Sequence, residues 1–472
     1  MLDYSTHFAL GEKACAFLTN SPDPFHAVQN SVVNLKSAGF TELKTGDPFG
    51  GKITPGGKYY YTFNNSTLVA FTVGQNYKAG NGFVILGGHT DSPTLKIKPR
   101  SKQEKHGCSL LGVECYGGGL WHTWFDRDLG ISGRLLIQEE NGSIVQKLVK
   151  IDQPVARVST LCIHLQSAEE RKAFAASMED HTAPIIATTP KSLLEQGSEE
   201  QLNKWQKGHD SLLLNAIAKK AGVLKDSIVD MELNMFDIQP ASLGGFQTEF
   251  LNSARLDNLA TVFCSIEALI EFSSDLSASK DVCLVALFDH EEVGSQSAHG
   301  AGSPVMANAV SRISTALGNH PGVLDPDLYA ASLCKSFVLS VDMAHAIHPN
   351  YASKHESNHA PKLNGGIVIK TNSNQRYTTN AMTGFIVREL ARSASLPIQE
   401  FVVRNDCPCG STIGPIISAN TGIRTVDIGM PQLSMHSCRE MMGIADLTNG
   451  FKLFKAYFQG FRAIDDKLES VC

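Results

Sequence analysis

The chain is best approached through Asp281–Gly294, DVCLVALFDHEEVG, because this stretch joins a buried strand to a cluster of charges. Its apolar part, Cys283–Phe288, carries no charge and has the length of a strand that is buried on both faces. Four ionisable residues, 289–292, follow at once. Charges at the end of a buried strand are costly unless a ligand or a metal compensates them. Because ligands bind at the carboxyl ends of strands in open α/β sheets, we expect Glu291 and Glu292 to face a site.

Two further apolar runs also end in side chains that can bind a metal. The run 83–86 leads into His89 and Asp91, which point to the same face if the chain is extended. The run Phe337–Val341 leads into Asp342. A structural alternative exists for the first pair, in which His89 merely caps a strand and Asp91 a turn.

Asp257 and His436 complete the candidate ligand set. Asp257 precedes an apolar-periodic helix, so its alternative role is that of a helix cap. His436 follows a fourth expected strand, 424–428, through a loop. Two histidines and three carboxylates suit zinc, manganese or cobalt, and their number fits two metal ions that share a bridging carboxylate. We assign Asp257 as the bridge; His89 and Asp342 would bind one metal, and Glu292 and His436 the other.

The two glutamates are expected to differ in role. Glu291 and Glu292 are adjacent, so in an extended chain their side chains point in opposite directions. One of them can bind metal while the other, Glu291, acts as a general base toward a metal-activated water. Asp91 would orient His89 and raise its basicity. The chain has no HExxH motif, which excludes the zinc site carried by a single helix.

Composition limits the class of protein. At 472 residues, the chain is expected to form two domains. Its net charge of −6 argues against nucleic acid or an anionic membrane as a partner. No run approaches the roughly 18 apolar residues of a membrane span. The 11 cysteines are scattered without a CxxC pair, and the first residues do not form a signal peptide, so we expect a cytoplasmic protein.

A change in the sequence pattern divides the chain into two parts. Two helices are predicted within residues 8–40, broken at the prolines of 21–24, and a hairpin is predicted at Asn64-Asn65. From residue 95 the sequence is β-rich, and the α/β pattern resumes at Gly244-Gly245. We therefore predict an α/β fold with a discontinuous domain, 1–94 and 244–472, and an inserted β-rich domain, 95–243.

Several segments together resemble the aspartyl aminopeptidase family of dinuclear zinc peptidases. They occur in the family's order from about residue 10 to 460: SPDPFHAV, GGHTDSP, SARLDN, DHEEVGS, VDMAHAIHPNY, VIKTNSNQRY, RNDCPCGSTIGP and MPQLSMHSCREM. The resemblance implies a mixed-sheet catalytic domain, two Zn²⁺ ions per subunit (with Mn²⁺ or Co²⁺ as alternatives in one site) and removal of N-terminal Asp or Glu from peptides. It also implies that the inserted domain serves assembly into a tetrahedral homododecamer. The implied ligands and catalytic residues coincide with those assigned above: His89, Asp257, Glu292, Asp342 and His436 bind metal, and Asp91 and Glu291 are catalytic.

The resemblance also implies substrate contacts. An acidic substrate side chain needs a cationic or donor-rich pocket. Lys370 and Tyr377 match substrate-contacting positions of the family, as does Asp342, whereas a single lysine is more often simply solvated. His345 would line the same cleft or play a structural part, and His164 resembles a histidine that a neighbouring subunit donates to the active site.

Two other functions remain open from the sequence. The first keeps the fold but prefers a neutral N-terminal residue. The second is a catalytically idle shell, or an autophagy cargo, whose assembly is its function. An intact ligand set with Glu291 argues against the idle shell, since such a shell has no reason to keep a costly acidic cluster.

Overall fold

The computed structural model describes residues 4–188 and 203–468. They divide into two compact units. The first comprises Met1–Asp91, Ala241–Met435 and Glu440–Cys472, and the second comprises Ser92–Pro240 and His436–Arg439. The chain thus leaves the first unit after Asp91 and returns to it at Ala241.

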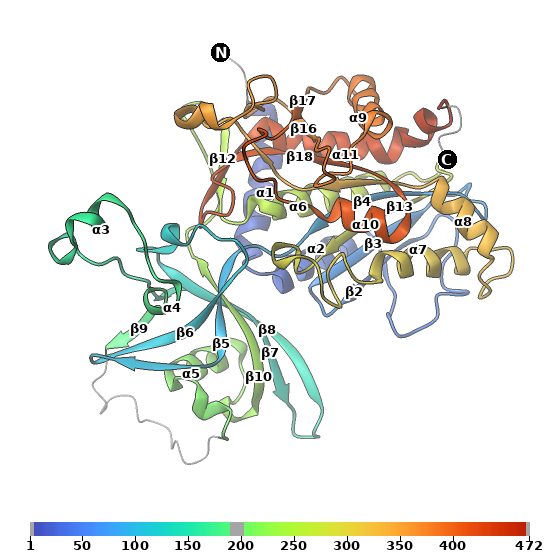
Figure 1. The fold of residues 1–472 in the computed structure, drawn as a ribbon. Helices are drawn as coiled ribbons and strands as arrows, with labels where there is room; N and C mark the ends of the chain where they lie inside the picture. Colours follow the sequence, from blue (N-terminus) through green and yellow to red (C-terminus); the bar gives the residue numbers. More distant parts are fainter. Residues whose placement is uncertain (1–3, 189–202, 469–472) are drawn as a thin grey trace. The chain divides into compact units, whose positions relative to one another are not determined.

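The described strands of the first unit build a nine-stranded mixed sheet in the order β1-β2-β3-β13-β4-β14-β18-β16-β17 (Figure 1). Their bounds are β1 Thr41–Glu42, β2 Lys58–Phe63, β3 Thr67–Val73, β4 Phe83–His89, β13 Val282–Phe288, β14 Phe337–Val341, β16 Ile367–Lys370, β17 Ile398–Phe401 and β18 Arg424–Gly429. Strand β4 pairs in parallel with β13 and β14, and β14 pairs in parallel with β18. The carboxyl ends of these four strands therefore meet at one edge of the sheet. The mixed α/β fold class is confirmed.

The hairpin turn and the helix break predicted for the amino-terminal part are present in the structure. The hairpin between β2 and β3 turns at Asn64 and Asn65, whose φ angles of 52° and 55° are left-handed, as asparagine tolerates. Helix α1 (Phe8–Asn20) ends before the prolines, and α2 (Pro24–Ser37) begins at the second one. Asp23 caps α2 by accepting a hydrogen bond from the backbone amide of His26 at 3.0 Å.

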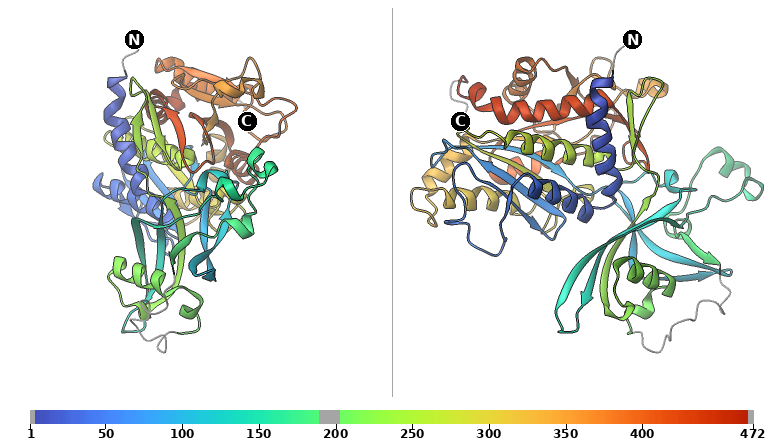
Figure 2. Two further views of the ribbon diagram at one scale, coloured as in Figure 1. Left: turned by 90° about the vertical axis from the view of Figure 1, so that its left-hand side faces the viewer. Right: turned by 180° about the vertical axis from the view of Figure 1, so that it is seen from behind.

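Helices cover both faces of this sheet. One face carries α1, α2, α6 (Leu256–Phe272), α9 (Ala381–Ser393) and α11 (Ile444–Asp465), whose apolar side chains form one core. The other carries α7 (Val305–Ala316) and α10 (Ile413–Thr421), next to α8 (Pro326–Cys334). The view from behind in Figure 2 shows the long α11, in red, running beside α6. Such two-sided cover explains why β13 is a continuous apolar run.

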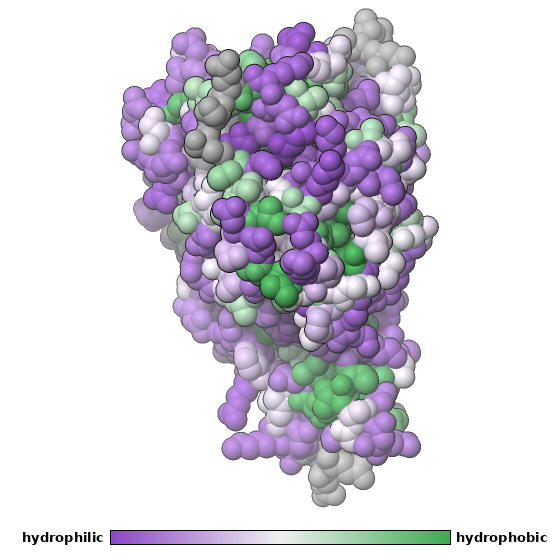
Figure 3. Space-filling view, turned by 90° about the vertical axis from the view of Figure 1, so that its right-hand side faces the viewer, coloured by the Kyte–Doolittle hydropathy of each residue, from purple (hydrophilic) through white to green (hydrophobic). Residues whose placement is uncertain are grey.

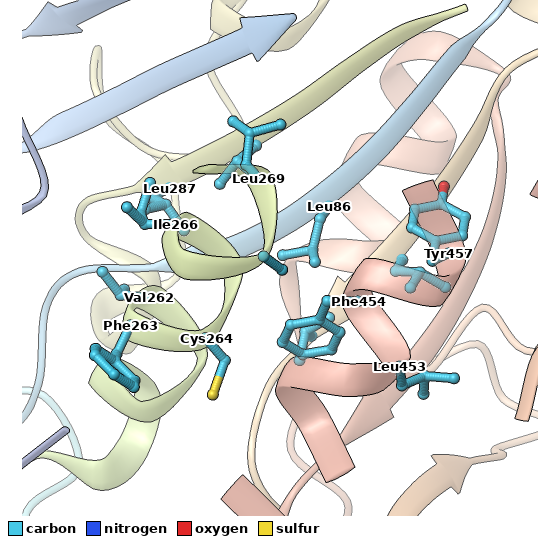
Figure 4. Packing of buried hydrophobic residues seen from close by; sticks show 14 of the residues in the cluster. Leu86, Val262, Phe263, Cys264, Ile266, Leu269, Leu287, Leu453, Phe454 and Tyr457 are labelled. Carbon is cyan, nitrogen blue, oxygen red and sulfur yellow. The ribbon is translucent and has the colours of Figure 1, made fainter. Parts of the chain in front are cut away.

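The Tyr457 hydroxyl is buried in the core between α6 and α11. Figure 4 shows residues of this core on both helices, among them Cys264 and Leu269 of α6 and Phe454 and Tyr457 of α11, with Leu86 of β4 between the helices. The Tyr457 hydroxyl accepts a hydrogen bond from the backbone amide of Ile85 at 3.2 Å and donates to the carbonyl of Phe337 at 2.7 Å. The tyrosine thereby ties α11 to the amino-terminal parts of β4 and β14.

A smaller sheet completes the first unit. It has five strands in the order β11-β12-β20-β19-β15 among the described residues. Their bounds are β11 Ser242–Gly244, β12 Phe250–Ser253, β15 Ala344–His345, β19 Pro431–Leu433 and β20 Glu440–Gly443. Strand β15 follows β14 almost directly in the chain, so this sheet begins next to the carboxyl edge of the large one.

The described residues of the second unit form a six-stranded antiparallel sheet, β8-β7-β10-β5-β6-β9, that packs against α5 (Figure 1). The elements are β5 Thr94–Lys105, β6 Cys108–Tyr116, β7 Leu129–Gln138, β8 Ile144–Ala156, β9 Ile185–Thr188, α5 Ser211–Ala221 and β10 Ile228–Asp237. The segment from residue 165 onward looks irregular in the sequence, but it contains two short helices, α3 (Ala168–Lys172) and α4 (Met178–His181), before β9. Residues 189–202 lie outside the described part.

One face of the molecule is largely polar. Figure 3 shows a face that is mostly hydrophilic, with smaller hydrophobic patches between the polar side chains. Among the described residues, no helix is both long and apolar enough to cross a membrane. The cytoplasmic location stays a prediction.

Candidate metal and active site

His89, the last residue of β4, lies at the centre of a group of acidic side chains. Its Nδ1 atom is 3.0 Å from the carbonyl oxygen of Asp91, a contact that places the ring proton on Nδ1. Its Nε2 atom is 3.4 Å from Asp257 Oδ1, 3.7 Å from Asp342 Oδ1 and 3.8 Å from Glu291 Oε2. One ring nitrogen held by a carbonyl while the other faces carboxylates is the arrangement of a metal-binding histidine.

Glu291 and Glu292 lie in a 3-10 turn, η8 (Glu291–Val293), and not in an extended chain. His290 leads into this turn with a left-handed φ of 63°. The expectation that the two glutamates point in opposite directions is therefore wrong. Each of them offers an oxygen within 4.8 Å of a nitrogen of His89.

The carboxylate of Asp91 holds this turn. Its Oδ1 accepts a hydrogen bond from the backbone amide of Glu291 at 3.0 Å, and its Oδ2 accepts one from the amide of Glu292 at 3.1 Å. The Oδ1 atom is also 3.5 Å from His89 Nδ1. Asp91 thus contacts both the histidine and the turn that carries the two glutamates.

Asp257 lies at the beginning of α6 but is not in its N-cap position. Its backbone has an extended conformation, with φ −82° and ψ 105°, and its amide donates to Glu440 Oε2 at 3.1 Å. Its buried carboxylate offers an oxygen within 4.8 Å of ligand atoms of His89 and Asp342, and one within 4.8 Å of Glu292. The Asp257 carboxylate thus lies near His89 and Asp342 on one side and near Glu292 on the other. A carboxylate that bridges two cations would need such a position.

Lys370 ends β16 beside Asp342, which follows β14. Lys370 is only 2% exposed. Its Nζ atom lies 3.7 Å from Asp342 Oδ2, donates to the Met343 carbonyl at 3.2 Å and stands 5.0 Å from the centre of the Tyr377 ring. The alternative of a solvated Lys370 is therefore wrong, and the chain places a buried cation next to the acidic cluster.

The ionisation of the cluster reflects its burial. Burial alone would lower the pKa of His89, but the surrounding carboxylates, Glu291 first among them, raise it well above its ordinary value. Burial raises the pKa of the Glu291 carboxyl; His89 opposes this shift and the acidic neighbours add to it. Both shifts follow from the close packing of a buried histidine and several carboxylates.

This donor set fits a divalent metal. Zinc takes histidine nitrogens and carboxylate oxygens as ligands, and the two groups His89–Asp257–Asp342 and His89–Glu291–Glu292 supply both kinds within 4.8 Å. Buried carboxylates packed this closely repel one another, and a bound cation would remove that cost. The residues present are thus of the kinds that a divalent cation would need at this edge of the sheet.

Comparison with known proteins identifies the family. The model of the aminopeptidase I zinc metalloprotease (M18) family matches residues 17–458. The chain belongs to the M18 family. The family resemblance seen in the sequence is confirmed, and the chain is an aminopeptidase of a zinc-metalloprotease family.

Other M18 proteins are similar over nearly the whole chain. A probable aspartyl aminopeptidase of Ricinus communis is 47% identical, covering 96% of this chain and 95% of the relative. Aspartyl aminopeptidase 4 of Saccharomyces cerevisiae is 42% identical, covering 96% and 95%. A chain in the cryo-EM structure of the Ape4 and Nbr1 complex has a TM-score of 0.94 and 43% identity, covering 98% and 88%. The mApe1 dodecamer of S. cerevisiae has a TM-score of 0.85 and 31% identity, covering 97% and 98%.

Three other histidines were predicted from the sequence to act at the site. His436 belongs to the second unit, where its Nδ1 atom is 3.1 Å from the carbonyl of Gly118; its ligand role stays a prediction. His164 lies in the 3-10 turn η3 (Ile163–Leu165) of the same unit and is exposed. His345 is an exposed residue of the first unit whose ring centre lies 5.7 Å from that of Phe401.

Sequence reasoning missed two buried carboxylates near this M18 site. Glu440 accepts the hydrogen bond from Asp257 described above, and Asp427 lies inside β18 with no exposed surface. A signal for Asp427 exists, because an aspartate is out of place in the middle of a strand expected to be buried, 424–428. Glu440 has no comparable local signal, since its partner is 183 residues away.

Proposed function

We propose that this chain removes N-terminal Asp or Glu residues from peptides. The observation that carries the proposal is the buried Lys370 ammonium beside Asp342 and over the Tyr377 ring. An acidic substrate side chain loses its hydration on entering such a pocket, and a fixed cation compensates that loss. The relatives of R. communis and S. cerevisiae that are named aspartyl aminopeptidases support the same specificity.

We assign the metal ligands as follows. His89 and Asp342 would hold one Zn²⁺, Glu292 and His436 the other, and Asp257 would bridge them. When bound, the ions supply Lewis acidity toward the scissile carbonyl and toward water. The distances from His89 to Asp257 and Asp342, and the placement of Asp257 near Glu292, support this division.

Glu291 would then act as the general base. Its carboxylate takes a proton from the attacking water as the water oxygen bonds to the scissile carbonyl carbon. The same proton then passes to the leaving amine nitrogen as the carbon–nitrogen bond breaks. Asp91 keeps Glu291 in position through the backbone hydrogen bond at 3.0 Å and contacts His89 at the same time.

We further propose that Lys370 and Tyr377 form the side of the substrate pocket that binds the acidic side chain. Lys370 pairs with the substrate carboxylate, and Tyr377 restricts the position of the ammonium from one side. Asp342 and His345 lie at the neighbouring strand ends β14 and β15, where the substrate's amino terminus would bind.

The β-rich domain, 95–243, is proposed to serve assembly into a homododecamer, with His164 completing the active site of a neighbouring subunit. Support comes from the solved relative that is a dodecamer and from a row of exposed apolar side chains in this domain. That row comprises Leu161, Ile163, Leu165 and Phe174. Sedimentation of the purified protein measures the assembly, and Ile163→Glu is expected to dissociate it.

The test of the proposed function is hydrolysis of Asp-, Glu- and Leu-initiated peptides with bound metal quantified in the same sample. We expect preference for Asp and Glu and about two zinc ions per chain. Metal with turnover but no acidic preference would overturn the role of Lys370 and favour a neutral-residue aminopeptidase. Neither metal nor turnover would favour the idle shell.

A further inference from the structure

Asp427 is a buried carboxylate within β18, and its hydrogen bonds reach two separate loops. Its Oδ2 accepts from both the backbone amide and the hydroxyl of Thr378, at 2.6 and 2.7 Å. Its Oδ1 accepts from the hydroxyl of Thr412 at 2.6 Å. Short hydrogen bonds to an ionised oxygen are among the strongest that a protein makes.

The first of these two loops contacts Lys370, and the second contacts the first. Thr378 directly follows Tyr377, whose ring lies under the Lys370 ammonium. Thr412 ends the loop that carries Cys409 and Ser411. Cys409 packs against the apolar cluster that contains Tyr377, and the Ser411 hydroxyl donates to the carbonyl of Arg376, next to Tyr377, at 3.4 Å. The two loops therefore touch at Tyr377 and are both anchored on Asp427.

The hydrogen bond from Thr412 to Asp427 replaces the helix cap that a threonine in this position usually makes. Thr412 occupies the N-cap position of α10, where a threonine hydroxyl ordinarily accepts a hydrogen bond from the helix. Here the hydroxyl makes no cap bond and donates to Asp427 instead. The carboxylate also approaches the first turn of α10 closely, because a Cβ atom at Gly414 would lie 2.5 Å from Asp427 Oδ1.

We propose that Asp427 is a positioning residue that fixes Tyr377 through Thr378 and Thr412 and thereby sets the preference for acidic substrates. The inference rests on the specificity proposed above. The side-chain hydrogen bonds of Asp427 described above go to Thr378 and Thr412, so it would act through the positions of the two loops. Loss of either threonine hydroxyl would loosen one loop and enlarge the space beside Lys370, so that binding of an acidic side chain suffers more than turnover of a neutral one.

The test compares Thr378→Val and Thr412→Val, which keep side-chain shape and remove one donor each, with Asp427→Asn. Thr425→Val is the matched control, since Thr425 is an equally buried residue of β18 whose hydroxyl donates to the Ile423 carbonyl. The readouts are KM and kcat for Asp- and Leu-initiated peptides, together with the melting temperature.

We expect each threonine variant to lower the Asp-to-Leu ratio of kcat/KM by about fivefold or more, mainly through a higher KM for the Asp peptide. Thr378→Ser and Thr412→Ser should restore the ratio, and Thr425→Val should leave it unchanged. An unchanged ratio in folded threonine variants, or an equal loss for both peptides, overturns the inference even if Asp427→Asn does not fold. A wild-type protein without acidic preference would instead overturn the proposed function, and this inference with it.

Discussion

The carboxylate of Asp91 accepts a hydrogen bond from the backbone amide of Glu291 at 3.0 Å, across 200 residues of sequence. The contact exists because β4 and β13 are parallel neighbours, with His89 paired to Phe288. Asp91→Asn would place an amide group against two backbone amides, and one of these would lose its acceptor. We expect kcat and zinc affinity to fall by about 10- to 100-fold, measured by peptide hydrolysis and metal titration. Wild-type values for both would contradict the role of Asp91 in holding the turn.

Replacement of the proposed general base should separate the chemical step from metal binding. In Glu291→Gln the side chain keeps its size but loses the ability to accept a proton. We expect kcat to fall by about 10²- to 10⁴-fold while bound zinc is retained. Glu292→Gln is the matched comparison, since a lost ligand should lower zinc content as well. An active Glu291→Gln enzyme would exclude the mechanism proposed here.

Lys370→Met tests the specificity pocket, because methionine fills much of the same volume without a charge. The kcat/KM for Asp-initiated peptides should fall by about 10- to 100-fold, while that for Leu-initiated peptides should change little or rise. Lys362→Met, at an exposed lysine shortly before β16, is the control. Equal losses on both peptides, with metal content reduced, would indicate that Lys370 serves Asp342 alone.

Removal of metal should affect both activity and stability. Without a cation, the carboxylates around His89 repel one another in a buried site. Dialysis against a chelator should therefore abolish hydrolysis and lower the melting temperature, and added Zn²⁺ should restore both. Mn²⁺ and Co²⁺ are compared in the same assay. Full activity in a sample shown by elemental analysis to contain no metal would contradict the metal site.

The buried hydroxyl of Tyr457 is expected to stabilise the first unit. Tyr457→Phe leaves the Ile85 amide and the Phe337 carbonyl without this partner, at a cost of about 1–3 kcal/mol. The melting temperature should fall by several degrees, measured by calorimetry. Tyr351→Phe, at an exposed tyrosine, should leave it unchanged.

Much of the fold could be predicted from local pattern. The hairpin at Asn64-Asn65, the break between α1 and α2 and the buried strand at Cys283–Phe288 depend on turn chemistry, proline and hydrophobic periodicity. The sequence also indicated which strand ends carry ionisable groups. The turn at Glu291 could not be foreseen, because its shape depends on the left-handed His290 and on acceptors supplied by Asp91.

The sequence by itself thus determined the element types, the family and the identity of the candidate ligands. Only the tertiary structure decided that Lys370 is buried beside Asp342, and that Asp427 joins the loops of Thr378 and Thr412. The physical reason is the distance along the sequence over which each kind of interaction acts. Periodicity and turn preference act over a few neighbouring residues, whereas the burial of a charge depends on partners that strand order brings together from distant parts of the chain.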